Sequence, residues 1–114
     1  MDSPPDETIA CRANALAALR RGDRSAAEQA FSSLLHRRPD DAEALQFLAT
    51  CQLDRGQTTR AIELLQTALH SQPRDPAILH QLGSAQMLAG DLHAAADSLR
   101  EGLQLAPGMF VARL

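Results

Sequence analysis

The sequence repeats itself every 34 residues. Proline, glycine, alanine and a bulky apolar residue each recur at this spacing in three copies. The four columns are Pro39, Pro73 and Pro107; Gly22, Gly56 and Gly90; Ala27, Ala61 and Ala95; and Phe31, Leu65 and Leu99. Agreement of four columns is not expected by chance, so each copy is one structural unit. The units span residues 8–41, 42–75 and 76–109.

Turn and capping residues divide each unit into two predicted helices. Glycine tolerates the positive φ that ends a helix, and proline cannot continue a helix interior, so the glycine columns end the first helices and the proline columns end the second. The first helices are predicted to begin at Ser3-Pro4, at Asp40 with Glu43 in a capping box, and at Asp75-Pro76. The second helices are predicted to be capped by Asp23, Thr58 and Asp91.

The composition favours an all-α fold with an aliphatic core. Alanine (21 residues) and leucine (18 residues) are strong helix formers and make up about a third of the chain, whereas β-branched residues are scarce. Small residues allow helix backbones to approach closely, at Ala15, Ala49 and Gly83 and in the Ala27 column. The other predicted core positions are Leu45, Leu48, Leu64, Ala68, Leu69, Leu79, Leu82, Leu99 and Leu103. One helix pair cannot cover its own apolar face, so neighbouring pairs must stack.

The columns resemble the tetratricopeptide repeat (TPR) family, whose pattern contains L-G, A-x₃-F and a final proline. The A-x₃-F element is present as Ala27/Phe31 and, with leucine, in the later copies, and the L-G pair is present as Leu82-Gly83. The first copy matches least. The resemblance implies a right-handed superhelical α-solenoid of three helix-turn-helix repeats. It would have about six helices in a single domain, 1–114, with residues 110–114 starting a seventh helix or cap.

In this family the first helix of each repeat lines a concave groove, so the resemblance implies that a peptide or protein segment binds there. The candidate groove residues are Arg12, Leu16, Leu19, Arg20, Glu43, Gln46, Phe47, Thr50, Asp54, Ala77, His80, Gln81, Ser84 and Met87. Phe47 is either a binding anchor or a residue that packs against Leu16. Some family members clamp the carboxylate of a chaperone tail, but at the matching positions only Arg12 could form a strong charged hydrogen bond. Chaperone-tail binding is therefore disfavoured.

The sequence carries no pattern typical of an enzyme, a metal site or a cofactor site. It has no nucleophile elbow and no glycine-rich phosphate loop, and none of its histidines are spaced i, i+4. His36 and His70 occupy one column near helix ends, where a cation complements the helix dipole. Cys11 and Cys51 are interpreted as small core residues, with a bridge between helices as the alternative. We expect no catalytic residues, no metal and no cofactor.

Charge and hydropathy narrow the choice of partners. The formal net charge is −3 and no basic block is present, so no nucleic-acid partner is expected. No apolar run approaches the roughly 18–20 residues that span a membrane, and the acidic N-terminus is not typical of a signal peptide. These features predict a cytoplasmic protein whose partner is a protein or peptide.

The end of the sequence leaves two further interpretations open. Met109, Phe110, Val111 and Leu114 are apolar, whereas a terminal repeat usually carries a polar cap. The chain could therefore be the N-terminal accessory, substrate-positioning region of a larger bacterial enzyme of the transferase or hydroxylase type. Alternatively, these four residues could form a self-association surface that makes a homodimer.

Overall fold

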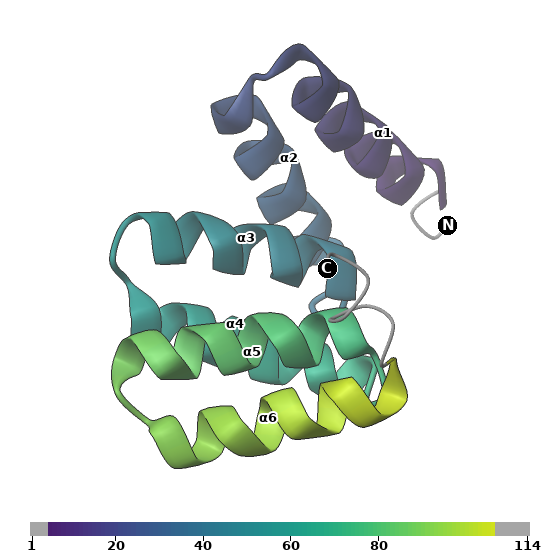
Figure 1. The fold of residues 1–114 in the computed structure, drawn as a ribbon. Coiled ribbons are helices and arrows are strands. Elements are labelled where there is room, and N and C mark those ends of the chain that lie inside the picture. The colour runs from purple at the N-terminus through teal and green to yellow at the C-terminus, as the bar shows by residue number, and fades with distance from the viewer. Residues whose placement is uncertain (1–4, 107–114) are drawn as a thin grey trace.

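A computed structural model describes residues 5–106 of the chain, and within that range all regular structure is α-helical. The helices are α1 (Pro5–Arg21), α2 (Arg24–Arg37), α3 (Ala42–Asp54), α4 (Thr58–Ser71), α5 (Pro76–Ala89) and α6 (Leu92–Leu105). Consecutive helices pair as hairpins, and the three hairpins stack in chain order from α1–α2 to α5–α6 (Figure 1). The predicted all-α solenoid of helix hairpins is confirmed. The predicted seventh helix lies outside the described residues.

The glycine and proline columns end the helices as predicted. Gly22, Gly56 and Gly90 have φ values of 76°, 79° and 86°, in the left-handed region that glycine adopts without strain. The second helices end just before the proline columns, for example at Arg37 before Pro39. The 34-residue spacing therefore corresponds to one complete hairpin and its connection to the next.

Aspartate caps four of the six helices. Asp23, Asp75 and Asp91 accept hydrogen bonds from backbone N–H groups in the first turns of α2, α5 and α6, as predicted. The prediction for α3 was wrong by one residue, because the cap is Asp41, which accepts from the N–H of Ala44, and not Asp40 with Glu43.

The prediction for α4 was also wrong. Thr58 is its first helical residue, and the cap position belongs to Gln57, which makes no capping hydrogen bond with its side chain. The predicted start of α1 at Ser3-Pro4 lies outside the described residues.

The core is continuous across the three hairpins and almost entirely aliphatic. Both small-residue columns are buried, which confirms the close approach of paired helices. The largest fully buried side chains are Phe31, Leu34, Cys51, Leu65, Ile78 and Leu79.

The core prediction fails on α6, the last described helix. Leu99 is half-buried, and Leu103 is 42% exposed although its counterpart Leu69 packs against the core. The reason is positional: α5 packs on α4, whereas no described helix comes after α6 to cover the equivalent face.

Candidate functional site

The predicted groove residues all lie on α1, α3 and α5, which we call the first helices, and none of them is fully buried. We call this set of fourteen residues the groove face. Its half-buried members are Arg12, Leu16, Gln46, Phe47, Ala77, Gln81 and Ser84. Its exposed members are Leu19, Arg20, Glu43, Thr50, Asp54, His80 and Met87. The sequence pattern thus separates the accessible side of each first helix from the side that faces the core.

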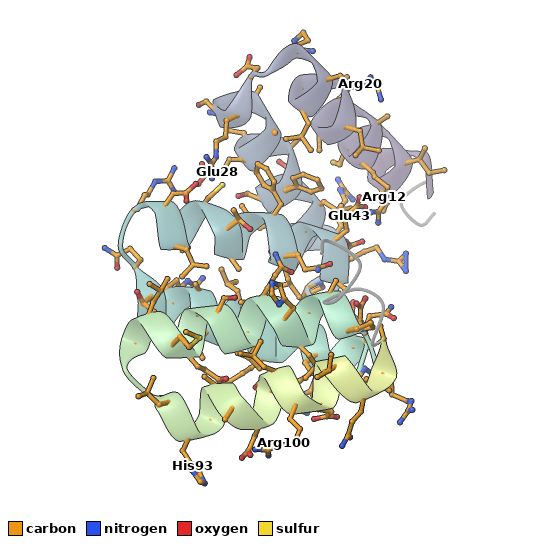
Figure 2. All side chains as sticks on the ribbon, viewed as in Figure 1. Arg12, Arg20, Glu28, Glu43, His93 and Arg100 are labelled. Carbon is orange, nitrogen blue, oxygen red and sulfur yellow. The ribbon has the colours of Figure 1, made fainter. Side chains whose placement is uncertain are left out.

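Arg12 is held by two carboxylates at the N-terminal end of α3. Its guanidinium pairs with Asp41, the cap of α3. It also pairs with Glu43 in the first turn of that helix, and Figure 2 shows Glu43 beside Arg12. The hydrogen bond to Asp41 raises the pKa of Arg12 above its ordinary value, against the opposing effect of partial burial. A partner carboxylate would have to compete with these two internal acids for the Arg12 guanidinium.

Phe47 is both packed and partly accessible. Its ring lies 4.9 Å from the ring of Phe31 in α2, measured between centroids, with the planes tilted by 36°. This contact fixes Phe47 against the core while part of its surface remains open to the groove face. The pairing with Phe31 was not found from the sequence, because the two residues belong to different repeats and to different columns.

A short amide network joins α3 to α5. Gln46 donates from Nε2 to Oε1 of Gln81 over 2.6 Å, and Gln81 donates from Nε2 to the hydroxyl of Thr50 at 3.5 Å. Thr50 in turn donates to the backbone carbonyl of Gln46 over 3.1 Å. The middle of the groove face is therefore neutral and polar, with donor and acceptor groups at the surface.

Two ion pairs connect α2 to the C-terminal end of α3. Arg24 pairs with Asp54, and Arg55 makes a bidentate contact to Glu28, with N–O distances of 2.6 and 2.7 Å. The hydrogen bond from Arg55 lowers the pKa of Glu28 below its ordinary value. Together with Arg12, these pairs join the first repeat to the second through charge.

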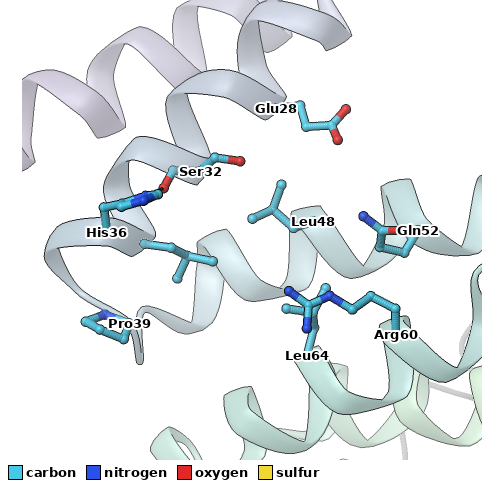
Figure 3. A pocket seen from close by; sticks show the side chains of 9 residues that line it. Glu28, Ser32, His36, Pro39, Leu48, Gln52, Arg60 and Leu64 are labelled. Atoms are coloured by element: carbon cyan, nitrogen blue, oxygen red, sulfur yellow. Dashed lines mark hydrogen bonds between the residues drawn. The ribbon is translucent and has the colours of Figure 1, made fainter.

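Two cavities lie where the first repeat meets the second. One, of about 300 Å³, opens on the groove face and is lined by Leu19, Gly22, Arg24, Phe47, Thr50 and Asp54. We call it the anchor cavity. The other, of about 460 Å³, lies between α2 and α4, with Leu48 and Leu64 among its apolar walls and Glu28 and Arg60 among its charged ones (Figure 3). Leu48 and Gln52 project from the side of α3 opposite the groove face, because each helical residue turns by about 100°. A segment lying along the first helices would not reach this second cavity.

The cysteines and histidines occupy ordinary structural positions. Cys51 is buried, Cys11 is half-buried against the core, and both are free thiols. His36 and His70 lie in the last turns of α2 and α4, as predicted from their shared column. Among the described residues, no three His, Cys, Asp or Glu side chains are grouped closely enough to hold a metal ion.

Two accessible apolar residues were missed by the sequence analysis. Ile9 in α1 is 65% exposed and occupies the column of Glu43 and Ala77, which were both assigned to the groove face. Leu88 near the end of α5 is 69% exposed and occupies the column of Arg20 and Asp54, both of which were assigned to the groove face. That shared column was the signal that could have identified it. The predicted self-association residues Met109, Phe110, Val111 and Leu114 lie outside the described residues, so that surface stays a prediction.

Comparison with known proteins identifies the repeat. A family model described as tetratricopeptide repeat matches residues 18–84, which is more than half of the chain. Among solved structures, an O-GlcNAc transferase mutant from Thermobaculum terrenum superposes with a TM-score of 0.81 at 30% identity over 94% of this chain. MamA superposes with a TM-score of 0.75 at 25% identity over 88% of this chain. A yeast Sti1 TPR2B domain in complex with pHsp70 superposes with a TM-score of 0.76 over 93% of this chain, but at 17% identity it shares only the fold.

The chain is much shorter than the first two of these proteins. It covers 21% of the transferase chain, 55% of the MamA chain and 87% of the Sti1 chain. No curated protein matches it significantly in sequence. Of the helices described, none is long and apolar enough to cross a membrane.

Proposed function

Because the chain belongs to the tetratricopeptide repeat family, we propose that it holds a peptide or protein segment along the groove face of its first helices. The fold is one that supports scaffolds for protein–protein interaction, and this coarser function comes with family membership. Binding to the groove face is the additional step proposed here.

One observation carries this step: large apolar side chains remain uncovered on the first helices. Leu19, Met87 and Leu88 are 40%, 53% and 69% exposed, and Phe47 is only half-buried. The same helices also carry polar side chains that are already hydrogen-bonded within the chain, such as Gln46 and Gln81. An apolar surface ringed by polar side chains is typical of protein interaction sites.

The test uses peptides selected from a displayed library of random 12-residue sequences on the whole chain. The changes in backbone amide chemical shift that peptide binding causes, measured by NMR, should be concentrated in α1, α3 and α5. The double variant Met87→Ser/Leu88→Ser should raise the Kd of the selected peptides by about tenfold or more, equivalent to about 1.4 kcal/mol of binding free energy. Leu92→Ser is the matched control, since Leu92 is 66% exposed but lies on α6. Shifts confined to α2, α4 and α6, or an equal loss with the control, would overturn the proposal.

A second candidate is that this chain is an accessory region that positions a protein substrate for an attached enzyme. The similarity to about a fifth of an O-GlcNAc transferase favours it, because the matched stretch is part of a longer enzyme chain. Groove binding and an accessory role are compatible. Reading the gene downstream of Leu114 is the test: an open frame encoding a catalytic domain supports this candidate, and a stop codon at that point excludes it.

A further inference from the structure

We propose that the anchor cavity receives one apolar side chain of the bound segment, a specificity that rests on the proposed function of the groove face. The cavity lies between the end of α1, the start of α2 and the exposed side of α3. Its volume of about 300 Å³ is at the lower limit of small-molecule sites, which run from roughly 300 to 1,000 Å³. A space of this size suits a side chain better than a cofactor.

The apolar walls of the anchor cavity are Leu19 and Phe47, and the second of them is rigid. Phe47 is fixed by its ring contact with Phe31, and Leu19 at the end of α1 also lines the cavity. Gly22 contributes no side chain, and an added Cβ there would meet nothing within 4 Å, so that wall is open for entry. A rigid aromatic surface beside an accessible aliphatic one is the usual setting of an interface anchor.

The charges at the rim favour an uncharged occupant. Arg24 and Asp54, the two charged residues of the lining, pair with each other. Thr50 already donates its hydroxyl proton to the Gln46 carbonyl. A charged side chain that entered would lose water without gaining a free counter-ion, whereas an apolar side chain would lose only unfavourable hydration.

Comparison between repeats shows which contact a side chain bound in the anchor cavity would supply. Leu53, one repeat after Leu19, is half-buried and packs against the core, whereas Leu19 is 40% exposed. The counterpart of Phe47 is Gln81, which is bonded to Gln46. The first junction thus combines an uncovered leucine with an aromatic wall, and a partner side chain would cover Leu19 much as the chain itself covers Leu53.

The test fills the cavity from one side. In Thr50→Phe the new ring occupies the space beside Phe47, and Thr67→Phe is the matched control, because Thr67 is also exposed and also donates to a carbonyl four residues earlier over 3.1 Å. The probes are N-acetyl-leucine amide and N-acetyl-aspartate amide, titrated while the amide signals of α1 and α3 are followed. The leucine probe should bind with a Kd on the order of 1 mM and the aspartate probe at least tenfold more weakly.

The expected result is that Thr50→Phe abolishes the shifts caused by the leucine probe and Thr67→Phe leaves them unchanged. Leu19→Ser serves as a second variant if Thr50→Phe fails to fold, and it should raise the Kd of the leucine probe severalfold. If both probes bind equally, or if the leucine probe binds Thr50→Phe as tightly as it binds the parent, the proposal that the anchor cavity receives an apolar side chain is overturned.

The same variants separate this inference from the proposed function. If library-selected peptides still bind α1, α3 and α5 but are indifferent to Thr50→Phe, the anchor cavity fails and the groove face stands. If no selected peptide shifts the first helices while the leucine probe still enters, the cavity stands as a site and the groove face fails.

Discussion

Arg24 of α2 pairs with Asp54 of α3, and one repeat later the same two positions hold Thr58 and Leu88. The residues that make the other two ionic contacts also change one repeat later. Glu28 and Arg55 are replaced by Ile62 and Ala89, and Arg12, which pairs with Asp41 and Glu43, is replaced by Gln46. The first junction, between α1–α2 and α3–α4, is therefore ionic. At the equivalent positions of the second junction, between α3–α4 and α5–α6, only Asp75, the counterpart of Asp41, carries a charge.

Salt should loosen the first junction selectively. Raising the salt concentration from 0.1 to 1 M shortens the Debye length from about 10 to about 3 Å, which screens exposed ion pairs but leaves apolar packing intact. Hydrogen exchange of α1 and α2 amides, followed by mass spectrometry, should accelerate severalfold while that of α5 and α6 stays constant. In the double variant Arg24→Thr/Asp54→Leu, which copies the second junction, the acceleration should be smaller. Uniform acceleration of all six helices would contradict this difference between the junctions.

Acid should remove the contribution of the Glu28 contact. The pKa of Glu28 in the folded chain lies below its ordinary value of 4.5, because Arg55 donates hydrogen bonds to the carboxylate. A lowered folded-state pKa stabilises the fold above the unfolded value, and this stabilisation is lost as the pH falls through the folded-state pKa. Glu28→Gln should therefore lower the Tm at pH 7, and the difference from the parent should be smaller at pH 3 than at pH 7.

Thermal unfolding followed by circular dichroism measures this effect. Glu101→Gln on the exposed side of α6 is the control, and its Tm should differ little from that of the parent at either pH. A Glu28→Gln deficit that is equally large at pH 3 and pH 7 would show that Glu28 acts through packing and not through its charge.

Local chemistry explains why most of the fold could be predicted. Glycine at positive φ, aspartate at a helix start and proline after a helix end act within a few residues, so the columns of Gly22, Asp23 and Pro39 locate the helices directly. The errors in the predicted caps also have local causes. At α3 two aspartates stand side by side, and Asp41, whose backbone is extended, is the one that caps the helix.

Contacts between repeats could not be predicted in the same way. The Phe31–Phe47 ring contact and the Arg12–Asp41 pair depend on the angle at which one hairpin packs on the next, and the column pattern does not contain that angle. The exposure of Leu103 likewise depends on whether another helix packs on α6. The fourteen residues of the groove face are all at least partly accessible, and their role in binding stays a prediction. The anchor cavity emerged only from the three-dimensional arrangement.

Gly83 should not tolerate a side chain, although it lies inside a helix. A Cβ added there would lie 2.6 Å from Cγ and 2.7 Å from Cδ2 of Leu99. The gain of about 1 kcal/mol in helix propensity from Gly83→Ala is opposed by overpacking of about 1–3 kcal/mol, so we expect a net loss of about 1 kcal/mol. Chemical denaturation measures this loss.

A double-mutant cycle with Leu99→Ala tests the cause of the loss. If the clash is responsible, Gly83→Ala/Leu99→Ala loses less stability than the sum of the two single variants. A Gly83→Ala variant more stable than the parent would show that Leu99 moves aside at no cost.

Gln57→Asp should stabilise the protein by supplying the capping bond that α4 lacks. The backbone at Gln57 (φ −89°, ψ 67°) closely matches that at Asp23 (φ −93°, ψ 84°) and Asp91 (φ −88°, ψ 77°), whose side chains both cap. A carboxylate at this position can therefore accept from the N–H of Arg60 without backbone change, and it also complements the positive end of the helix. We expect a gain of about 1 kcal/mol and a Tm higher by about 4–8 °C.

The reciprocal change Asp91→Gln, at the same column of the next repeat, should cost a similar amount because it removes an existing cap. Gln57→Asn separates the two sources of the gain: it keeps the accepting oxygen but carries no charge, so any deficit relative to Gln57→Asp measures the interaction with the helix dipole. Thermal unfolding of the three variants at one pH and salt concentration makes the comparison. If Gln57→Asp is no more stable than the parent while Asp91→Gln is destabilised, the two cap positions are not equivalent, and the repeat symmetry does not extend to this turn.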